Sequence, residues 1–288
     1  MRVGFIGLGR MGGPMAARIV AGGHSVVGYD IAAARRQQTA LGVVFVDSLA
    51  AAAADADIVI TSLPGPAEVK SVIEGPDGLL SSLKHAAILL ETSTISPQQS
   101  REFAEQFLAR GVSYLDAPIS GGVQGARDGT LVAMVGGAAD VLERARPVLT
   151  CFTKNIFHLG PVGAGNVMKL VIQSIFLSQM AGFLESVSMG ERSGITLDTL
   201  LSVVASSSAH HPTIGTRYEK LRAENLDPMF EVESAVKDLS LAEDVWRELG
   251  QLFPTLASAL SDYRNAAANG LSRADLIALR TWFNRGAK

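Results

Sequence analysis

Three glycines near the start of the chain have the spacing of a phosphate-binding turn. Gly7, Gly9 and Gly12 form a G-x-G-x-x-G pattern directly after the apolar run Arg2–Ile6. Between a strand and a helix, the first glycine permits a tight turn and the second lets the backbone approach a pyrophosphate. The third lets the helix pack against the strand, and the N-terminus of that helix faces the anion. In this context the pattern predicts a dinucleotide site rather than an ordinary glycine-rich turn.

An acidic residue stands where a ribose-binding carboxylate is expected. Asp30 follows the run Ser25–Tyr29 and lies 23 residues after the first glycine of the pattern. A carboxylate there accepts hydrogen bonds from ribose hydroxyls and repels a 2′-phosphate, which favours NAD over NADP. Two alternatives stay open: Asp30 caps a helix over Ala32–Leu41, or Arg35 and Arg36 hold a 2′-phosphate.

A serine followed by two glycines forms a second polar site. Ser120, Gly121 and Gly122 come shortly after a predicted strand that ends at Asp116. The glycines leave backbone N–H groups accessible, so that the hydroxyl and the amides together could hold a carboxylate. The alternative is a strand-to-helix turn in which Ser120 is the N-cap.

A lysine occurs inside an apolar helical stretch. Lys169 lies within Val167–Ile172, and Asn166 and Gln173 share its helix face because they are three and four residues away. A lysine desolvated there could exchange protons near neutral pH, as a catalytic acid or base does. The alternative is a structural lysine whose stem packs while its ammonium reaches water.

The remaining charged motifs are weaker. Lys237 could contribute to a site, but a surface pair with Glu233, four residues earlier, is the simpler interpretation. His210 and His211 lack a third ligand at a recognisable spacing, and Cys151 is the only cysteine, so we expect no metal site. We expect the residues Ser206–His211 to form a loop that borders the substrate and sets its selectivity.

The first half of the chain must position these residues. Short apolar runs alternate there with helical segments, which predicts a parallel sheet covered on both faces. The expected strands are Val3–Ile6, Ser25–Tyr29, Val43–Val46, Ile58–Ser62, Ala87–Glu91, Val112–Asp116 and Thr130–Val135, and the expected helices are Met11–Ala21, Ile31–Leu41, Pro97–Ala109 and Ala138–Leu149.

The second half reads as helices only. A long helix over about 165–192 comes first, and prolines separate the later ones. Those are expected at Thr196–Ala205, Val232–Leu249, Pro254–Asn269 and Ala274–Phe283. We therefore expect two domains: residues 1–162 bind the dinucleotide, and residues 163–288 form a helical substrate and oligomerisation domain.

Composition excludes several classes of protein. Of the 288 residues 48% are hydrophobic and 18% charged, which is enough apolar surface for a large core and argues against disorder. The net charge of −3 argues against sequence-independent nucleic-acid binding. The most apolar stretch, Leu170–Phe183, contains polar residues and falls short of the ~20 apolar residues of a membrane span. We expect a soluble, cytoplasmic protein, and the positive mean hydropathy of +0.25 suggests a homo-oligomer, a dimer or tetramer.

These motifs together resemble the β-hydroxyacid dehydrogenase family, which includes 3-hydroxyisobutyrate dehydrogenases and tartronate-semialdehyde reductases. The resemblance covers nearly the whole chain, because four separated blocks occur in the family's order. They are GLGRMGGPM at Gly7–Met15, DAPISGGVQGARDGTL at Asp116–Leu131, GPVGAGNVMKLVIQ at Gly160–Gln173 and KDLSLA at Lys237–Ala242, with weaker similarity in SLPGPAEV at Ser62–Val69 and ETSTISP at Glu91–Pro97.

The resemblance implies a fold and a set of roles. The fold is an α/β Rossmann-type N-terminal domain joined by a long interdomain helix to an all-α C-terminal domain. Lys169 is the implied catalytic acid or base. The implied substrate-binding residues are Ser120, Gly121, Gly122, Gln173 and Lys237, and the implied cofactor-binding residues are Gly7, Leu8, Gly9, Arg10, Met11, Gly12, Asp30, Leu63, Pro64, Thr94 and Lys237. Members commonly carry asparagine where this chain has Gln173, whose longer side chain offers the same amide donors.

The predicted function is hydride transfer between NAD, or NADP, and a small β-hydroxy acid such as 3-hydroxyisobutyrate, or its semialdehyde. One alternative is an NADP-dependent imine reductase of similar architecture, and Lys169 counts against it because such enzymes typically lack this lysine. The other is a catalytically silent nucleotide-binding module. Such relatives are expected to lose the lysine and gain basic appendages, neither of which this chain shows.

Overall fold

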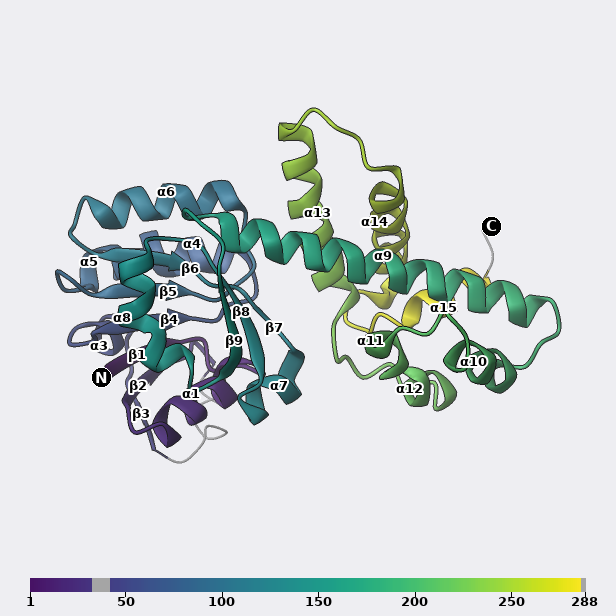
Figure 1. Ribbon diagram of the computed structural model, residues 1–288, viewed down its shortest axis with the longest axis horizontal. Helices are drawn as coiled ribbons and strands as arrows, with labels where there is room; N and C mark the ends of the chain where they lie inside the picture. Colours follow the sequence, from purple (N-terminus) through teal and green to yellow (C-terminus); the bar gives the residue numbers. More distant parts are fainter. Residues whose placement is uncertain (33–41, 286–288) are drawn as a thin grey trace. The chain divides into compact units, whose positions relative to one another are not determined.

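The computed structural model describes residues 1–32 and 42–285 (Figure 1). The helix predicted at Ile31–Leu41 and the arginines Arg35 and Arg36 fall almost entirely outside this part of the chain. The described chain divides into two compact units, Met1–Lys169 and Leu170–Lys288.

A six-stranded parallel sheet forms the centre of the first unit. Its strand order is β3-β2-β1-β4-β5-β6. The strands have nearly the predicted bounds. They could be recognised in the sequence because strands covered on both faces are almost continuously apolar. They are β1 (Arg2–Ile6), β2 (Ser25–Tyr29), β3 (Val43–Phe45), β4 (Ile58–Thr61), β5 (Ile88–Glu91) and β6 (Ser113–Asp116).

A second, three-stranded sheet corrects the sequence analysis. The predicted strand at Thr130–Val135 is β8 (Leu131–Val135), and it belongs to this sheet rather than to the large parallel one. It pairs antiparallel with β7 (Ile119–Ser120) and parallel with β9 (Thr153–His158). Neither partner was predicted. β7 has only two residues, and β9 is half exposed and carries the polar sequence TKNIFH, so neither produces an apolar run.

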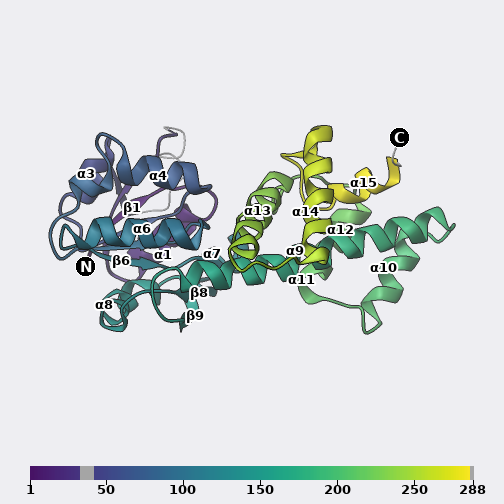
Figure 2. The ribbon, with the colours of Figure 1, turned by 90° about the horizontal axis from the view of Figure 1, so that it is seen from above.

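Helices cover both faces of the large sheet, and Figure 2 shows the two layers. One core joins it to α1 (Gly12–Ala21), α7 (Gly122–Asp128) and α8 (Ala139–Leu149). The other joins it to α3 (Leu49–Ala53), α4 (Pro66–Glu74), α5 (Leu79–Ser82) and α6 (Pro97–Leu108). The short helices α3, α4, α5 and α7 were not predicted, because segments of four to nine residues contain too few turns for a clear helical period.

The second unit is helical, as predicted. Its elements are the greater part of α9 (Ala164–Arg192), then α10 (Leu197–Ala205), α11 (Pro212–Gly215), α12 (Tyr218–Arg222), α13 (Val232–Glu248), α14 (Pro254–Ala266), the π-helical turn η1 (Ala267–Leu271) and α15 (Ala278–Arg285). The last helix begins at Ala278 rather than at Ala274. Asp275 explains the difference, because its carboxylate accepts the N–H of Ile277 and holds the preceding turn outside the helix.

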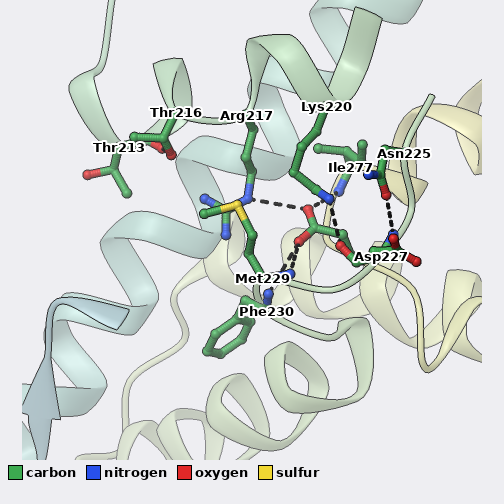
Figure 3. A network of polar contacts seen from close by, with 10 residues as sticks. Thr213, Thr216, Arg217, Lys220, Asn225, Asp227, Met229, Phe230 and Ile277 are labelled. Atoms are coloured by element: carbon green, nitrogen blue, oxygen red, sulfur yellow. Dashed lines mark hydrogen bonds and ion pairs between the residues drawn. The ribbon is translucent and has the colours of Figure 1, made fainter. Parts of the chain in front are cut away.

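A buried ion pair lies inside this unit and joins segments that are distant in sequence (Figure 3). Arg217 and Asp275 are both buried, and Arg217 Nε lies 3.3 Å from Asp275 Oδ1. The other carboxylate oxygen accepts the N–H groups of Met229 and Phe230. The guanidinium also lies 5.4 Å from the ring centroid of Phe176 on α9. Both charges are thus compensated, as buried charges must be.

By length and composition α9 is able to cross a membrane, contrary to the estimate from the sequence. This is weak evidence, because the core helix of a soluble protein meets the same criteria. In the most apolar 18-residue stretch of α9, 44% is buried inside the structure.

Candidate functional site

Those residues of the first unit that are predicted to bind a dinucleotide lie at one edge of the large sheet, whereas Lys237 lies on α13 (Val232–Glu248) in the helical unit. The glycine turn follows β1, Asp30 follows β2, Leu63 and Pro64 follow β4, and Thr94 follows β5. The carboxyl ends of parallel strands share an edge, so the fold gathers these residues. The strand order reverses between β1 and β4, because successive strands are added on one side of β1 up to β3 and on its other side from β4 onward. Open α/β sheets bind their ligands at such a point.

The glycine turn leaves room for a phosphate. Gly7 has φ +89° and donates its N–H to the carbonyl of Tyr29 at 2.9 Å. A Cβ at Gly12 would collide with the carbonyl oxygen of Gly7, which explains the third glycine. A Cβ at Gly9 would meet no atom within 4 Å. Packing therefore does not require Gly9, and the open space beside its backbone fits the pyrophosphate of a dinucleotide.

Asp30 is half-buried and holds the glycine turn. Its Oδ2 accepts the N–H of Leu8 at 2.7 Å, and its Oδ1 accepts the N–H of Ala32 at 2.8 Å. The second bond is local, while the first ties the end of β2 to the phosphate-binding turn. The helix that Asp30 would cap in the alternative interpretation lies outside the described residues. Asp30 is thus placed beside this turn, where a ribose would follow the pyrophosphate.

The loops after β4 and β5 are joined through Ser93, which the sequence analysis did not select. Its hydroxyl accepts the N–H of Leu63 at 2.8 Å, and its own N–H donates to Glu91 Oε1 at 2.7 Å. These bonds fix the backbone on both sides of the expected nicotinamide position. Pro64 is exposed and Thr94 is half-buried.

Two buried carboxyl groups end neighbouring strands behind these loops. Thr61, Glu91 and Asp116 are in register across β4, β5 and β6. Glu91 also accepts the hydroxyl of Thr61 at 2.6 Å. Burial is the main cause that raises the pKa of Glu91 to about 7 and that of Asp116 to about 6.

Lys169 lies beside the serine–glycine motif. Its side chain is 8% exposed, and Nζ donates to the carbonyl oxygen of Ile119 at 3.0 Å. The ammonium is therefore buried against the residue before Ser120 rather than extended into water.

The serine–glycine motif itself is accessible. Gly121 and Gly122 have φ +130° and +66° and are exposed, and Ser120 is half-buried. The N-cap of α7 is Gly121, without a side-chain capping bond, so the capping alternative for Ser120 is wrong. Near Lys169 the motif thus offers a hydroxyl together with exposed backbone.

In the helical unit, a buried acid joins the other two predicted substrate residues. Asp238 on α13 is 3% exposed. Its Oδ2 accepts from Gln173 Nε2 at 2.5 Å, and its Oδ1 lies 2.9 Å from Lys237 Nζ. The sequence analysis missed Asp238, although its place beside Lys237 in the KDLSLA block was a signal. One amide hydrogen of Gln173 is committed to this carboxylate.

The loop Ser206–His211 borders a cavity in the helical unit. Ser208 to His211 line a cavity of about 450 Å³ together with α9 residues from Gln179 to Val187. Those α9 residues begin six positions beyond Gln173, which is about 9 Å along a helix. The role of this loop in substrate selectivity stays a prediction. In the part of the chain that the structure describes, no three His, Cys, Asp or Glu residues form a candidate metal site.

Comparison with protein families assigns both halves of the chain. Residues 2–160 match the family described as the NAD binding domain of 6-phosphogluconate dehydrogenase. Residues 163–282 match the family described as "NAD-binding of NADP-dependent 3-hydroxyisobutyrate dehydrogenase".

Individual proteins show the same relationship. The 2-(hydroxymethyl)glutarate dehydrogenase of Eubacterium barkeri is 33% identical, covering 98% of this chain and 95% of its own length. The 3-hydroxyisobutyrate dehydrogenase of Pseudomonas aeruginosa is 38% identical, covering 83% of each chain. The Mycobacterium tuberculosis 3-hydroxyisobutyrate dehydrogenase, solved with L-serine, is 32% identical over 98% of each chain with a TM-score of 0.86. An imine reductase from Myxococcus stipitatus, 18% identical with a TM-score of 0.66, shares the fold.

The strand order, the glycine turn and these matches lead to one assignment. The chain belongs to the β-hydroxyacid dehydrogenase family and is an NAD(P)-dependent oxidoreductase that acts on the CH–OH group of a small hydroxy acid.

Proposed function

We propose that this enzyme interconverts a 3-hydroxypropanoate substituted at C2 and the corresponding semialdehyde, with NAD as the preferred cofactor. The observation that carries this proposal is the buried Lys169, whose ammonium is bound at Ile119 next to Ser120, Gly121 and Gly122. The group combines a proton-transferring side chain with donors for a carboxylate. A β-hydroxy acid needs both.

The names of the relatives narrow the substrate class. 2-(Hydroxymethyl)glutarate, 3-hydroxyisobutyrate and L-serine are all 3-hydroxypropanoates that differ in the substituent at C2. In each, a primary alcohol lies two carbons from the carboxylate carbon. A site that holds the carboxylate therefore fixes the distance to the reacting carbon and leaves the C2 substituent to set specificity.

Each residue then has a defined role. Lys169 exchanges the proton of the substrate hydroxyl, and Ser120 with the amides of Gly121 and Gly122 holds the carboxylate. Lys237 and Gln173 contribute a cation and an amide, both oriented by Asp238.

The dinucleotide supplies the hydride acceptor at its nicotinamide C4. The residues that would hold it are Gly7, Leu8, Gly9, Arg10, Met11, Gly12, Asp30, Leu63, Pro64, Thr94 and Lys237. Asp30 favours NAD, because a carboxylate beside the adenine ribose repels a 2′-phosphate.

The domain assignment belongs to the same proposal. Residues 1–162 bind the dinucleotide, and residues 163–288 shape the substrate site and form a homodimer or homotetramer. The cytoplasmic location expected from the sequence is part of the same proposal. The net charge of −3 supports a small-molecule substrate rather than a nucleic acid.

A substrate panel tests the reaction class. We expect NADH formation with 3-hydroxyisobutyrate, L-serine or 2-(hydroxymethyl)glutarate. Lactate, a 2-hydroxy acid, and isobutanol, which lacks the carboxylate, should react far more slowly. Faster reduction of a cyclic imine than of a semialdehyde would favour the imine reductase alternative. Absence of turnover with every compound would favour a silent nucleotide-binding module.

The variant Lys169→Ala tests the mechanism. We expect kcat to fall by ~10²–10⁴-fold, the usual contribution of a general acid or base. The affinity for NADH should change little, because the glycine turn holds the pyrophosphate. Lys70→Ala is the control, since Lys70 is exposed on α4. A folded Lys169→Ala variant with kcat within a few-fold of the wild type would refute the role of Lys169.

A further inference from the structure

The first turn of α9 is held by a carboxylate from a different element. Asp116, at the end of β6, is fully buried. Its Oδ1 accepts the N–H of Gly163 at 2.8 Å, and its Oδ2 accepts the N–H of Asn166 at 2.9 Å. The first N–H groups of a helix have no partner within the helix, and a negative charge is favourable at this end. Asp116 therefore anchors the beginning of α9 to the large sheet.

Glycines on both sides bring the backbone close to this carboxylate. A Cβ at Gly165 would collide with the main-chain oxygen of Met134 and would lie 2.9 Å from Asp116 Oδ2 and 2.8 Å from the main-chain oxygen of Asp116. A Cβ at Gly136, after β8, would collide with Asp116 Oδ1. Gly163, which donates to Asp116, has φ +93°, a conformation that side chains disfavour. The glycine-rich segment before Lys169 thus forms a cradle for the Asp116 carboxylate.

Asn166 fixes the rotation of the same turn. Its side chain is fully buried. Oδ1 accepts the N–H of Ile95 at 3.2 Å, and Nδ2 donates to Ser100 Oγ at 3.0 Å. Both partners belong to the segment that follows β5. Asp116 thus binds backbone N–H groups at the start of the turn, and the Asn166 side chain ties the turn to the segment after β5.

Lys169 follows Asn166 by three residues, or about 4.5 Å along the helix axis. The position of its Nζ at the Ile119 carbonyl therefore depends directly on where the first turn of α9 sits. We propose that Asp116 and Asn166 are positioning residues that hold Lys169 at the serine–glycine motif, with the adjacent glycines serving as the cradle for the Asp116 carboxylate. This proposal rests on the proposed role of Lys169.

A purely structural role predicts lower stability without a selective effect on catalysis. A positioning role predicts a lower kcat in a protein that is folded and still binds NADH. Misplacement of a catalytic group by about 1 Å can cost ~10²-fold in rate. We therefore expect Asp116→Asn, which keeps the shape but turns an N–H group toward a backbone N–H, to lower kcat by about 10²-fold. The dissociation constant of NADH should stay within about twofold of the wild-type value.

A matched pair of glycine substitutions tests the cradle without changing any charge. Gly165→Ala places a methyl group against Asp116 and against the main-chain oxygen of Met134, whereas Gly182→Ala places the same group on α9 where it meets no atom within 4 Å. We expect the first to reduce kcat and the second to leave it unchanged. Circular dichroism and thermal unfolding establish that each variant is folded at the assay temperature. If Asp116→Asn does not fold, Gly165→Ala decides, and a folded Gly165→Ala variant with kcat within twofold of the wild type overturns the proposal.

A double-mutant cycle separates this inference from the proposed function. If Asp116 acts through Lys169, Asp116→Asn should cost little further kcat in a Lys169→Ala background. If Lys169→Ala is nearly as active as the wild type, the proposed function fails by itself. If Lys169→Ala is slow and Asp116→Asn reduces the residual turnover by the same factor as in the wild type, the positioning role is wrong while the role of Lys169 stands.

Discussion

Asp30 has two roles to separate, because its carboxylate both holds the N–H of Leu8 and is expected to receive the adenine ribose. Asp30→Asn keeps one acceptor oxygen but removes the charge. We expect kcat/KM to be higher with NAD than with NADP in the wild type and the gap to narrow in the variant, because the 2′-phosphate is no longer repelled. Initial rates with both cofactors measure this. A wild-type preference for NADP would contradict the proposal that Asp30 makes NAD the preferred cofactor.

Gln173 is tied to Asp238, so its removal should affect stability as well as activity. Gln173→Leu deletes the amide that donates to Oδ2 and leaves a buried carboxylate with one donor fewer. We expect a loss of about 1–3 kcal/mol in the free energy of unfolding together with a lower kcat/KM for the hydroxy acid.

Gln179→Leu is the matched control for Gln173→Leu, because Gln179 is exposed on the same helix. Its effect on stability should stay within about 0.5 kcal/mol, as is usual for surface positions. Denaturant unfolding and steady-state kinetics measure both variants. Equal stability of the two variants would show that the bond to Asp238 contributes nothing.

The sequence could single out candidate site residues by their own chemistry or spacing, but not the residues that hold them in place. Lys169 stood out as a charge in an apolar helix, and Gly7, Gly9 and Gly12 by their spacing. Their partners are distant in sequence: Asp116 lies 50 residues before Asn166, and Asp238 lies 65 residues after Gln173. No local pattern encodes such pairs, so only the folded structure reveals them.

At the scale of elements, predictability followed burial. The six strands of the large sheet are apolar because both faces are covered, and each was predicted to within about a residue at either end. The half-exposed strand β9 and the two-residue strand β7 carry no such signal. The last helix was misplaced because Asp275 holds its preceding turn through tertiary bonds to Arg217, Met229 and Phe230.

Glu91, the buried carboxyl group at the end of β5, should make the stability of the protein depend on pH. Burial is the main cause that raises the pKa of Glu91 from 4.5 to about 7. Between pH 4.5 and pH 7 the Glu91 side chain is therefore protonated in the folded protein but ionised in the unfolded chain. The contribution of Glu91 to the free energy of unfolding is therefore largest below pH 4.5, and it decreases as the pH rises toward 7. The shift corresponds to about 3 kcal/mol.

Glu91→Gln should remove this dependence while leaving a neutral group of the same shape. We expect the melting temperature of the variant, relative to that of the wild type, to rise between pH 5 and pH 8. Thermal unfolding across this range measures the difference. Glu143→Gln is the control, because Glu143 is exposed and its pKa is lowered by Arg146, so its titration ends at lower pH. A constant difference between Glu91→Gln and the wild type would show that Glu91 is ionised throughout.

At the scale of the whole molecule, the helical unit leaves large apolar side chains in water. Met189 on α9 is 67% exposed and Val203 on α10 is 62% exposed, and Ile175 on α9 is also exposed. Such side chains are common at protein interfaces, and Met is enriched there. Together with the positive mean hydropathy of the chain, they support the proposed homo-oligomer.

The assembly prediction can be tested by placing charges on this surface. We expect light scattering at micromolar concentration to give the mass of a dimer or tetramer for the wild type. Met189→Glu combined with Val203→Glu should lower that mass, because a buried unpaired carboxylate opposes association. Leu108→Glu is the control, since Leu108 on α6 is 74% exposed in the first unit and should tolerate a charge without a change in mass. A monomeric wild type would contradict the oligomer, and an unchanged mass in the double variant would place its interface on another surface.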